Sequence, residues 1–248
     1  MSANNISVTI LTVTYNCEKT IAKTIESVLN QTYDNIEYLL IDGASTDGTI
    51  EIANRYQEAF KTRGISYRII SEPDEGMYDA LNRGAKLASG TLVGQINSDD
   101  QYESNAVEQM VSFYVSEGFD IAWADIRVVN GEKSFVKKAK IGKLWTTAGF
   151  CHPTMFSKRE ILLKYPYACR ALDDDFDFIL RAHKGGTNIK VLNEVLADYS
   201  FGGSFSKKGF KEMIKRIQCK YLTYRRNGFS RLYIFYSIAA EFAKFLYA

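Results

Sequence analysis

The sequence lacks the patterns that hold structural metals or disulfides. Its four cysteines are scattered over 248 residues, no two have the CxxC spacing, and His152 and His183 are the only histidines. This distribution supports neither a zinc site nor a disulfide framework, so it favours a reducing, cytosolic setting. The N-terminus lacks the basic start of a secretory signal peptide and leads directly into a strand-like apolar run, so no signal peptide is expected.

Two common nucleotide-binding motifs and a membrane-spanning run are also missing. No GxGxxG and no GxxxxGK[ST] occurs in the chain, which disfavours a dinucleotide oxidoreductase and a P-loop kinase. A transmembrane helix needs about 20 mostly uncharged apolar residues. The run from Leu232 has only 17 and includes Glu241 and Lys244. Hydrophobic residues make up 46% and charged residues 24%, as in soluble globular proteins.

Charge is present but unevenly distributed. The net charge is +2, yet residues from Phe205 onward carry +8 and the rest of the chain −6. This tail mixes basic with aromatic residues, a composition typical of an amphipathic helix on an anionic membrane surface. The alternative is that the tail packs on its own domain or on a second subunit. Nucleic acid is a further partner for a basic tail, but no recognition motif supports it.

Strands and helices alternate through the first hundred residues. The expected strands are residues 6–13, 36–41, 65–70 and 91–96, with helical spacing between them. Short connections of this kind predict a mostly parallel central sheet flanked by helices, an α/β fold in which ligands bind at the carboxyl ends of the strands. Polar residues gather at those ends, namely Tyr15 and Asn16, Asp42, residues 72–74 and residues 97–100.

The second half of the chain is less regular. Residues 119–129 are expected to form a strand, whereas in the first half Asp47 is expected to cap a single helix that ends at Gly64. The lysine-rich segment after that strand predicts a hairpin or a loop. The segment "LDDDFDFILRAHKGG" predicts a helix that ends at Gly185.

The segment "VGQINSDDQY", residues 93–102, ends its strand in two acids, Asp99 and Asp100. Asp and Asn are common turn formers, so an ordinary strand exit is one interpretation. The other is a divalent cation site, because Mg²⁺ and Mn²⁺ prefer one or two carboxylates together with phosphate and water oxygens.

Three further segments allow two interpretations each. The acids Asp173, Asp174 and Asp175 suit a helix start, but their mutual repulsion could also raise the pKa of one toward that of a general base. His152 lies among apolar residues, where a histidine often has a structural role. The glycine-rich "FGGSFSKK", residues 201–208, is either a plain loop or a flap over phosphate.

In their order along the chain, these motifs resemble inverting glycosyltransferases of family 2, which have a GT-A fold and use nucleotide sugars. The resemblance covers roughly residues 6–205 and is strongest to bacterial members that extend lipid-linked surface polysaccharides. The motifs that carry it are "TILTVTYN", "LLIDGASTDGT", "SEPDEGMYDALNRGAKLASG", "VGQINSDDQY", "GFCHPTMF" and "LDDDFDFILR". It implies a nucleotide-sugar-binding half in residues 1–100, an acceptor-binding half in residues 101–205, and a basic amphipathic extension in residues 206–248.

The resemblance also assigns donor-binding roles. Thr14, Tyr15 and Asn16 would flank the nucleotide base, and Asp42 would hydrogen-bond the uracil ring. A second group would border the diphosphate, the sugar and the cation: Asp74, Asp79, Asn97, Ser98 and Asp99.

The remaining implied roles concern the metal, the base and the acceptor. Asp99 corresponds to the second acid of the family's DxD motif and would bind Mn²⁺ or Mg²⁺, with Asp100 as a further ligand. Asp175 aligns with the catalytic base. His152, Asp174 and Ser204 are candidates for the acceptor site or a flap.

Three positions depart from the family pattern. Asn97 replaces the first acid of the DxD motif, which weakens the expected metal affinity. Gly43 replaces an acid of the base-binding loop. Leu81 replaces an arginine, so the phosphate charge must be met by a metal or by another cation.

The implied reaction is an in-line displacement in which Asp175 takes the proton of an acceptor hydroxyl. The donor is a UDP-sugar carrying a hexose or N-acetylhexosamine. The acceptor is a polyprenyl-diphosphate-linked saccharide of O-antigen, capsule or exopolysaccharide synthesis, met at the inner face of the bacterial cytoplasmic membrane. Two alternatives remain: a nucleotide-sugar-binding protein without activity, supported by Asn97, and a sugar-1-phosphate nucleotidyltransferase, for which a glycine-rich basic loop is missing.

Overall fold

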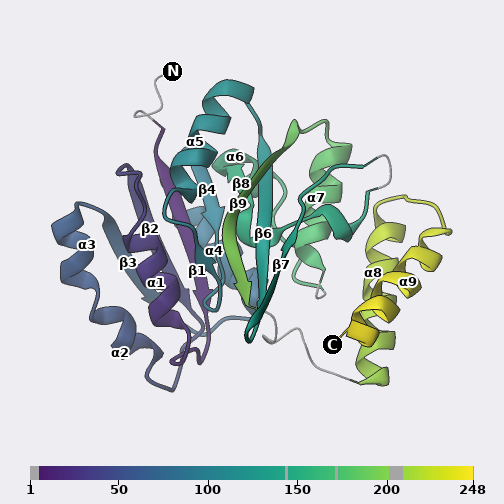
Figure 1. The fold of residues 1–248 in the computed structure, drawn as a ribbon, viewed down its shortest axis with the longest axis horizontal. Helices are drawn as coiled ribbons and strands as arrows, with labels where there is room; N and C mark the ends of the chain where they lie inside the picture. The colour runs from purple at the N-terminus through teal and green to yellow at the C-terminus, as the bar shows by residue number, and fades with distance from the viewer. Residues whose placement is uncertain (1–5, 143–144, 171–172, 201–208, 248) are drawn as a thin grey trace.

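The computed structural model describes residues 6–142, 145–170, 173–200 and 209–247. Within these residues nine strands form one sheet with the order β3-β2-β1-β4-β8-β6-β9-β5, and β7 pairs with β6 (Figure 1). The strands are β1 (Val8–Thr14), β2 (Ile36–Asp42), β3 (Ser66–Ser71), β4 (Leu92–Gln95), β5 (Gln101–Tyr102), β6 (Ile121–Asn130), β7 (Lys133–Lys137), β8 (Phe156–Lys158) and β9 (Ile189–Ser200). One sheet therefore runs through both halves of the sequence.

The first four strands are parallel, as the sequence predicts. β1 pairs with β2 and β4, and β2 pairs with β3. All seven residues of β1 are buried, because helices cover both faces of a sheet of this kind. β8 then pairs antiparallel with both β4 and β6, and β9 runs parallel to β6. The expected hairpin after residue 129 is confirmed by the antiparallel pairing of β6 with β7.

The helices of the main body follow the strands in sequence. They are α1 (Ile21–Leu29), α2 (Thr49–Asn54), α3 (Gln57–Arg63), α4 (Met77–Leu87), α5 (Ala106–Glu117), α6 (Arg159–Lys164) and α7 (Asp174–Lys184). α4 packs on β1 and β2, so it connects the core of the sheet to the loops at its carboxyl edge.

The single helix expected after Asp47 is divided into two. The carboxylate of Asp47 accepts a hydrogen bond from the Thr49 N–H at 3.0 Å, but the N-cap residue of α2 is Gly48, so Asp47 lies one residue before the position predicted for it. The N–H groups of Arg55 and Tyr56 then bond to carbonyls three residues back rather than four. These tighter turns end α2 and allow α3 to begin in a new direction.

The C-terminal segment forms a helical hairpin of α8 (Phe210–Arg226) and α9 (Tyr233–Tyr247). The two helices lie side by side at one end of the molecule, beyond α7 (Figure 1). α8 is docked on the body: the ring of buried Tyr224 lies 5.7 Å from that of Phe176, and Asn227 donates a 2.7 Å hydrogen bond to Asp177. None of the described helices is long and apolar enough to span a membrane.

Candidate active site

The polar strand ends meet at one edge of the sheet. Strand register places Thr14 beside Asp42, and Asp42 beside Ser71. β1 lies between β2 and β4, and residues 97–100 follow β4. The carboxyl ends of the four parallel strands therefore bring together side chains that are far apart in sequence.

The loops after β1 and β2 are fastened to each other by Asn16. Its backbone has the left-handed φ of 52°, which asparagine tolerates better than most residues. Its side-chain oxygen accepts a hydrogen bond from the Thr46 N–H at 2.8 Å, and its own N–H donates to the Ser45 hydroxyl at 2.8 Å. Tyr15 is 61% exposed beside it. Asn16 thus holds the loop in shape and leaves the Tyr15 ring open for stacking.

Asp42 is fully buried beneath these loops. One carboxylate oxygen accepts hydrogen bonds from the Ser45 N–H at 2.8 Å and from the Ser71 hydroxyl at 2.7 Å. The observed partners of Asp42 are therefore protein groups that order the loops. Its contact with a uracil ring stays a prediction.

Asp74 occupies the space beside Gly43. A Cβ added to Gly43 would lie 2.8 Å from an Asp74 carboxylate oxygen, closer than real Cβ contacts allow. An acid at position 43 would also place two negative charges in contact. The replacement of the family's acid by Gly43 is therefore matched by the approach of Asp74.

Arg83 supplies a cation that the sequence reasoning missed. Its guanidinium lies 3.5 Å from the carboxylate of Asp79 and 3.5 Å from that of Glu72, with its side chain 28% exposed. The i,i+4 spacing of Asp79 and Arg83 on the predicted helix was the signal that could have revealed this pair. Arg83 thus provides, two residues after Leu81, positive charge at the edge where a diphosphate is expected.

Asp99 and Asp100 have different surroundings. No described residue donates a hydrogen bond from elsewhere in the chain to the partly exposed carboxylate of Asp99, whose pKa is raised by burial. Asp100 is fully buried. One of its oxygens accepts the Ser200 N–H at 3.0 Å and the other has no hydrogen-bond partner in the described residues. Burial and the charge of Asp99 raise the pKa of Asp100 well above its ordinary value.

This donor set fits a divalent cation held by few protein ligands. In the described part of the chain, no group of three or more His, Cys, Asp or Glu side chains could hold a metal by itself. Asp99 offers an open carboxylate next to a buried carboxylate oxygen without a donor, and a cation would relieve the repulsion between the two acids. The remaining ligands would come from phosphate and water oxygens. Ser98, also at this turn, donates its hydroxyl hydrogen to the Cys17 sulfur at 3.0 Å.

Asp175, in the first turn of α7, joins the two halves of the fold. Its Oδ1 accepts hydrogen bonds from the Phe176 N–H at 2.7 Å and from the Tyr78 hydroxyl of α4 at 3.3 Å. Its Oδ2 lies 3.4 Å from Nδ1 of His152. Burial by itself would raise the pKa of Asp175, but His152, Phe176 N–H and Tyr78 together hold it below its ordinary value. Repulsion among the three acids therefore does not raise the pKa of Asp175.

The other candidates of the second half have varied positions. The Nε2 of His152 is buried and has no hydrogen-bond partner among the described residues. Asp174 is 1% exposed and its carboxylate accepts a hydrogen bond from the Arg170 N–H. Its role in an acceptor site stays a prediction. Ser204 and the glycine-rich segment 201–208 lie outside the described residues.

A cavity of about 360 Å³ lies near the Asp175–His152 pair, although neither residue lines it. It is lined by Trp123, Lys140, Ile141, Gly142, Trp145, Thr146, Phe150 and Phe176. Phe176 follows Asp175 in the chain, and the rings of Phe150 and His152 are nearly perpendicular with their centroids 6.3 Å apart. Phe150 and Phe176 therefore connect the cavity to the neighbourhood of the acid–histidine pair, and the aromatic lining suits the apolar face of a sugar ring.

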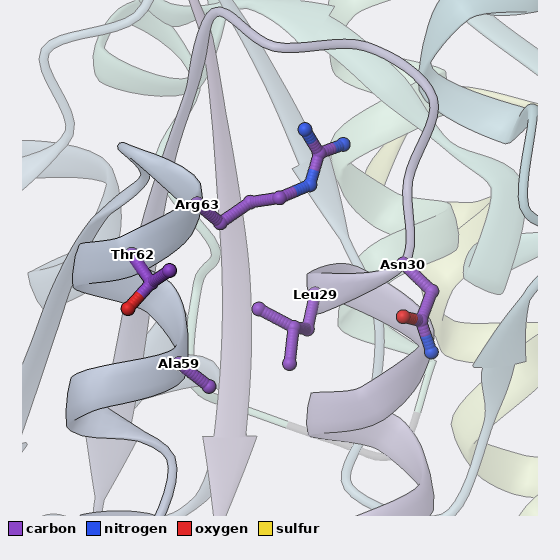
Figure 2. A pocket seen from close by; sticks show the side chains of 5 residues that line it. All are labelled: Leu29, Asn30, Ala59, Thr62 and Arg63. Carbon is purple, nitrogen blue, oxygen red and sulfur yellow. The ribbon is translucent and has the colours of Figure 1, made fainter.

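A second depression, of about 520 Å³, lies far from this chemistry. Figure 2 shows it between the last turns of α1 and α3, with the Arg63 side chain reaching across. Arg63 is already paired with Asp34 at 2.8 Å. The helix ends that form this depression lead into β2 and β3, so it belongs to the amino edge of the sheet.

Sequence comparison gives a family and several relatives. The profile of glycosyl transferase family 2 matches residues 9–177. The PGL/p-HBAD biosynthesis glycosyltransferase of Mycobacterium tuberculosis is 29% identical over 210 residues, which cover 82% of this chain and 81% of that protein. The UDP-Glc:alpha-D-GlcNAc-diphosphoundecaprenol beta-1,3-glucosyltransferase WfaP of Escherichia coli is 28% identical over 222 residues, covering 84% and 83%.

Solved structures share the fold. TarS of S. aureus in complex with UDP-GlcNAc superimposes with a TM-score of 0.71 at 17% identity, over 96% of this chain and 72% of TarS. The mannosyltransferase PcManGT of Pyrobaculum calidifontis, in complex with GDP-Man and Mn2+, gives 0.69 at 17% identity, over 96% and 74%. At this identity the likeness concerns the fold, and it confirms the predicted GT-A arrangement.

Proposed function

The chain belongs to glycosyl transferase family 2, and from that premise we propose that it transfers a sugar from a UDP-sugar to a hydroxyl of a lipid-linked saccharide, with inversion at the anomeric carbon. Glycosyl transfer follows from the family. The donor, the acceptor and the stereochemistry are the proposed part. The observation that carries the proposal is the place of Asp175, between Tyr78 of the donor half and His152 of the second half.

Asp175 is the proposed general base. Its Oδ1 is held by two donors, while its Oδ2 faces His152 at the longer distance of 3.4 Å. Because its pKa is held below the ordinary value, the carboxylate is ionised at neutral pH. It can accept the proton of an acceptor hydroxyl while the oxygen attacks the anomeric carbon opposite the leaving UDP. A single displacement of this kind inverts the configuration.

The carboxyl edge of the sheet is the proposed donor site. Exposed Tyr15 is placed to stack on the base, and Arg83 to meet the negative charge of the diphosphate. Asp99 would hold a Mn²⁺ or Mg²⁺ ion, which supplies positive charge next to the leaving diphosphate when bound. Thr14, Asp42, Asp74, Asp79, Asn97 and Ser98 shape or border this site, and the unpartnered oxygen of buried Asp100 would be a further ligand of the ion.

The aromatic cavity beside Asp175 is the proposed place of the acceptor sugar. Lys140 is exposed at its rim, where a phosphate of the acceptor would meet a cation. The name of the Escherichia coli relative gives it a diphosphoundecaprenol-linked acceptor, which supports a lipid-linked saccharide here. The donor sugar is proposed to be a hexose or N-acetylhexosamine, and the product a unit of O-antigen, capsule or exopolysaccharide. Such an acceptor places the enzyme at the inner face of the bacterial cytoplasmic membrane.

The test is UDP release from a panel of UDP-sugars, measured with and without a polyprenyl-diphosphate-linked saccharide. We expect release with one or a few donors, strongly increased by the acceptor and dependent on Mn²⁺ or Mg²⁺. UDP binding without any release would favour a binding protein. Release of pyrophosphate from UTP and a sugar 1-phosphate would favour a nucleotidyltransferase. Either outcome contradicts the proposal.

The metal is tested separately by titration calorimetry of UDP with and without Mn²⁺. Asp99→Ala should remove most of the Mn²⁺-dependent part of UDP binding, because the open carboxylate is lost. Asp34→Ala removes an acid that is 83% exposed and paired with Arg63 at the opposite edge of the sheet, and should leave binding unchanged. Equal Mn²⁺ dependence in Asp99→Ala and the wild type would exclude this ligand.

A further inference from the structure

Helix α9 presents apolar side chains to solvent and polar ones to the protein. Four large apolar residues of α9, together with Leu232 just before the helix, are between 42% and 69% exposed: Leu232, Phe235, Ile238, Phe242 and Phe245. From Phe235 onward they are spaced three and four residues apart, so they share one side of the helix. Ser237 and Glu241, the polar residues within the same turns, are buried. A surface helix of a globular protein shows the opposite arrangement, with its apolar side chains toward the core and its polar side chains toward solvent.

The inward position of Glu241 is fixed by two ion pairs. Its carboxylate lies 2.7 Å from the amine of Lys220 and 2.8 Å from the guanidinium of Arg216, both on α8. Lys220 is 2% exposed, so turning α9 over to bury its apolar side would separate this buried cation from the carboxylate that pairs with it on α9. The ion pairs therefore hold the apolar side of α9 outward.

The exposed charges of the hairpin have one sign. Lys211, Lys215, Arg226 and Arg231 are exposed, whereas the two acids in the described part of the hairpin are half-buried Glu212 and buried Glu241. An apolar stripe beside exclusively basic residues is complementary to a bilayer that carries anionic headgroups. A symmetric contact between two copies of this face would bring the same positive charges together without acids to pair them.

We propose that the apolar side of the hairpin lies in the headgroup region of an anionic bilayer. This apolar face consists of Leu232, Phe235, Ile238, Phe242 and Phe245. The basic residues of α8 and of the turn would contact lipid phosphates. The proposal rests on the proposed function in one respect, since a lipid-linked acceptor requires the enzyme to work at a membrane. The tie between α8 and α7, through Asn227–Asp177 and Tyr224–Phe176, holds the base-bearing helix next to this membrane-facing end (Figure 1).

The experiment is co-sedimentation with phosphatidylcholine vesicles, with and without phosphatidylglycerol. The wild type should bind the anionic vesicles more tightly, and added salt should weaken that binding. Phe235→Glu should weaken it about tenfold or more, because a charge replaces a ring that is 68% exposed. The matched control is Phe135→Glu, which changes a ring 63% exposed on β7 and should bind as the wild type does.

The basic residues are tested by the double variant Lys211→Glu/Lys215→Glu. The loss of each positive charge should weaken binding to anionic vesicles about fivefold, the added carboxylates should weaken it further, and the effect should vanish on vesicles of phosphatidylcholine alone. Lys61→Glu, at a side chain 78% exposed on α3, is the control.

Unchanged thermal unfolding and circular dichroism of Phe235→Glu would confirm that this substitution affects the surface only.

Unaltered vesicle binding of Phe235→Glu would overturn the proposal. A second result would also overturn it: the wild type sediments as a dimer without lipid, and Phe235→Glu makes it a monomer without changing vesicle binding. The apolar face would then be covered by a second copy of the chain. Transfer to a short-chain acceptor analogue distinguishes this proposal from the function. Phe235→Glu should retain that activity, whereas a wild type that binds vesicles and never releases UDP would contradict only the proposed function.

Discussion

Asp175 has two fixed contacts on one oxygen and an ionised state that its neighbours maintain. Asp175→Asn should lower turnover about 10²- to 10⁴-fold, because the amide cannot take the acceptor proton. UDP binding should be nearly unchanged, since the residue belongs to α7 rather than to the donor loops. The measurements are steady-state UDP release and calorimetric UDP binding on the same preparation. Turnover close to that of the wild type would exclude Asp175 as the base.

His152 is expected to act through Asp175, which makes it a positioning residue. Its loss should raise the pKa of Asp175, because burial continues to oppose ionisation while the contribution of the imidazole disappears. A carboxylate with a lowered pKa is ionised at every pH above that pKa, so the acid limb of kcat/KM should lie at low pH in the wild type. In His152→Gln this limb should move to higher pH.

The pH–rate profile of His152→Gln is the measurement, with the wild type as reference. A variant that loses activity equally at every pH, without a shift of the acid limb, would point to a packing role for His152. The same sign holds for stability: a lowered pKa of Asp175 stabilises the fold above pH 3.8, and that contribution is lost as the pH falls through the folded-state value.

At the scale of elements, the helical hairpin depends on a buried cluster of charges. Burial would lower the pKa of the Lys220 amine, but the charges of Asp173 and Glu241 raise it above its ordinary value. Stability from this raised pKa is present below pH 10.5 and is lost as the pH rises through the folded-state value. The hairpin is therefore expected to keep these ion pairs throughout the neutral range.

Glu241→Gln should destabilise the hairpin by about 3–5 kcal/mol, because it leaves Lys220 and Arg216 without their carboxylate. Hydrogen exchange of α8 and α9 should become faster, and the free energy of unfolding in urea should fall. Glu212→Gln changes the other acid of the described hairpin, for which no ion pair is found among the described residues, and should have little effect. Equal exchange rates in the two variants would contradict the structural role of the buried ion pairs.

At the scale of the whole molecule, the proposed donor and acceptor sites lie at different parts of one sheet. Ile141→Trp replaces an aliphatic side chain of the cavity near Asp175 with a larger indole ring. It should therefore raise the KM for the acceptor about tenfold. UDP binding and slow donor hydrolysis should stay unchanged, because the donor loops follow β1, β2 and β4. Val136→Trp, at an exposed position of β7 outside the cavity lining, is the control. A rise in the UDP-sugar KM instead would contradict a separate acceptor cavity.

The arrangement of the whole chain also explains how Asp175 is held in place. Tyr78 reaches Asp175 across 97 residues of sequence, and Ser200 reaches Asp100 across 100. These contacts exist because β9 and α7 return to the edge where β4 ends. The candidate site is therefore built by strand order as much as by the motifs that border it.

The sequence by itself determined the strand and helix alternation of the first half, the polar strand ends and the family, because short-range periodicity and ordered motifs report these directly. Only the tertiary structure decided which groups surround Asp175, that its pKa is lowered rather than raised, that Arg83 pairs with Asp79 near the carboxyl edge of the sheet, and that Asp100 is buried. It also decided that Glu241 faces inward and leaves the apolar side of α9 outside. The physical reason is common to all of them: burial and charge depend on residues that are distant in sequence, and folding alone brings those residues into contact.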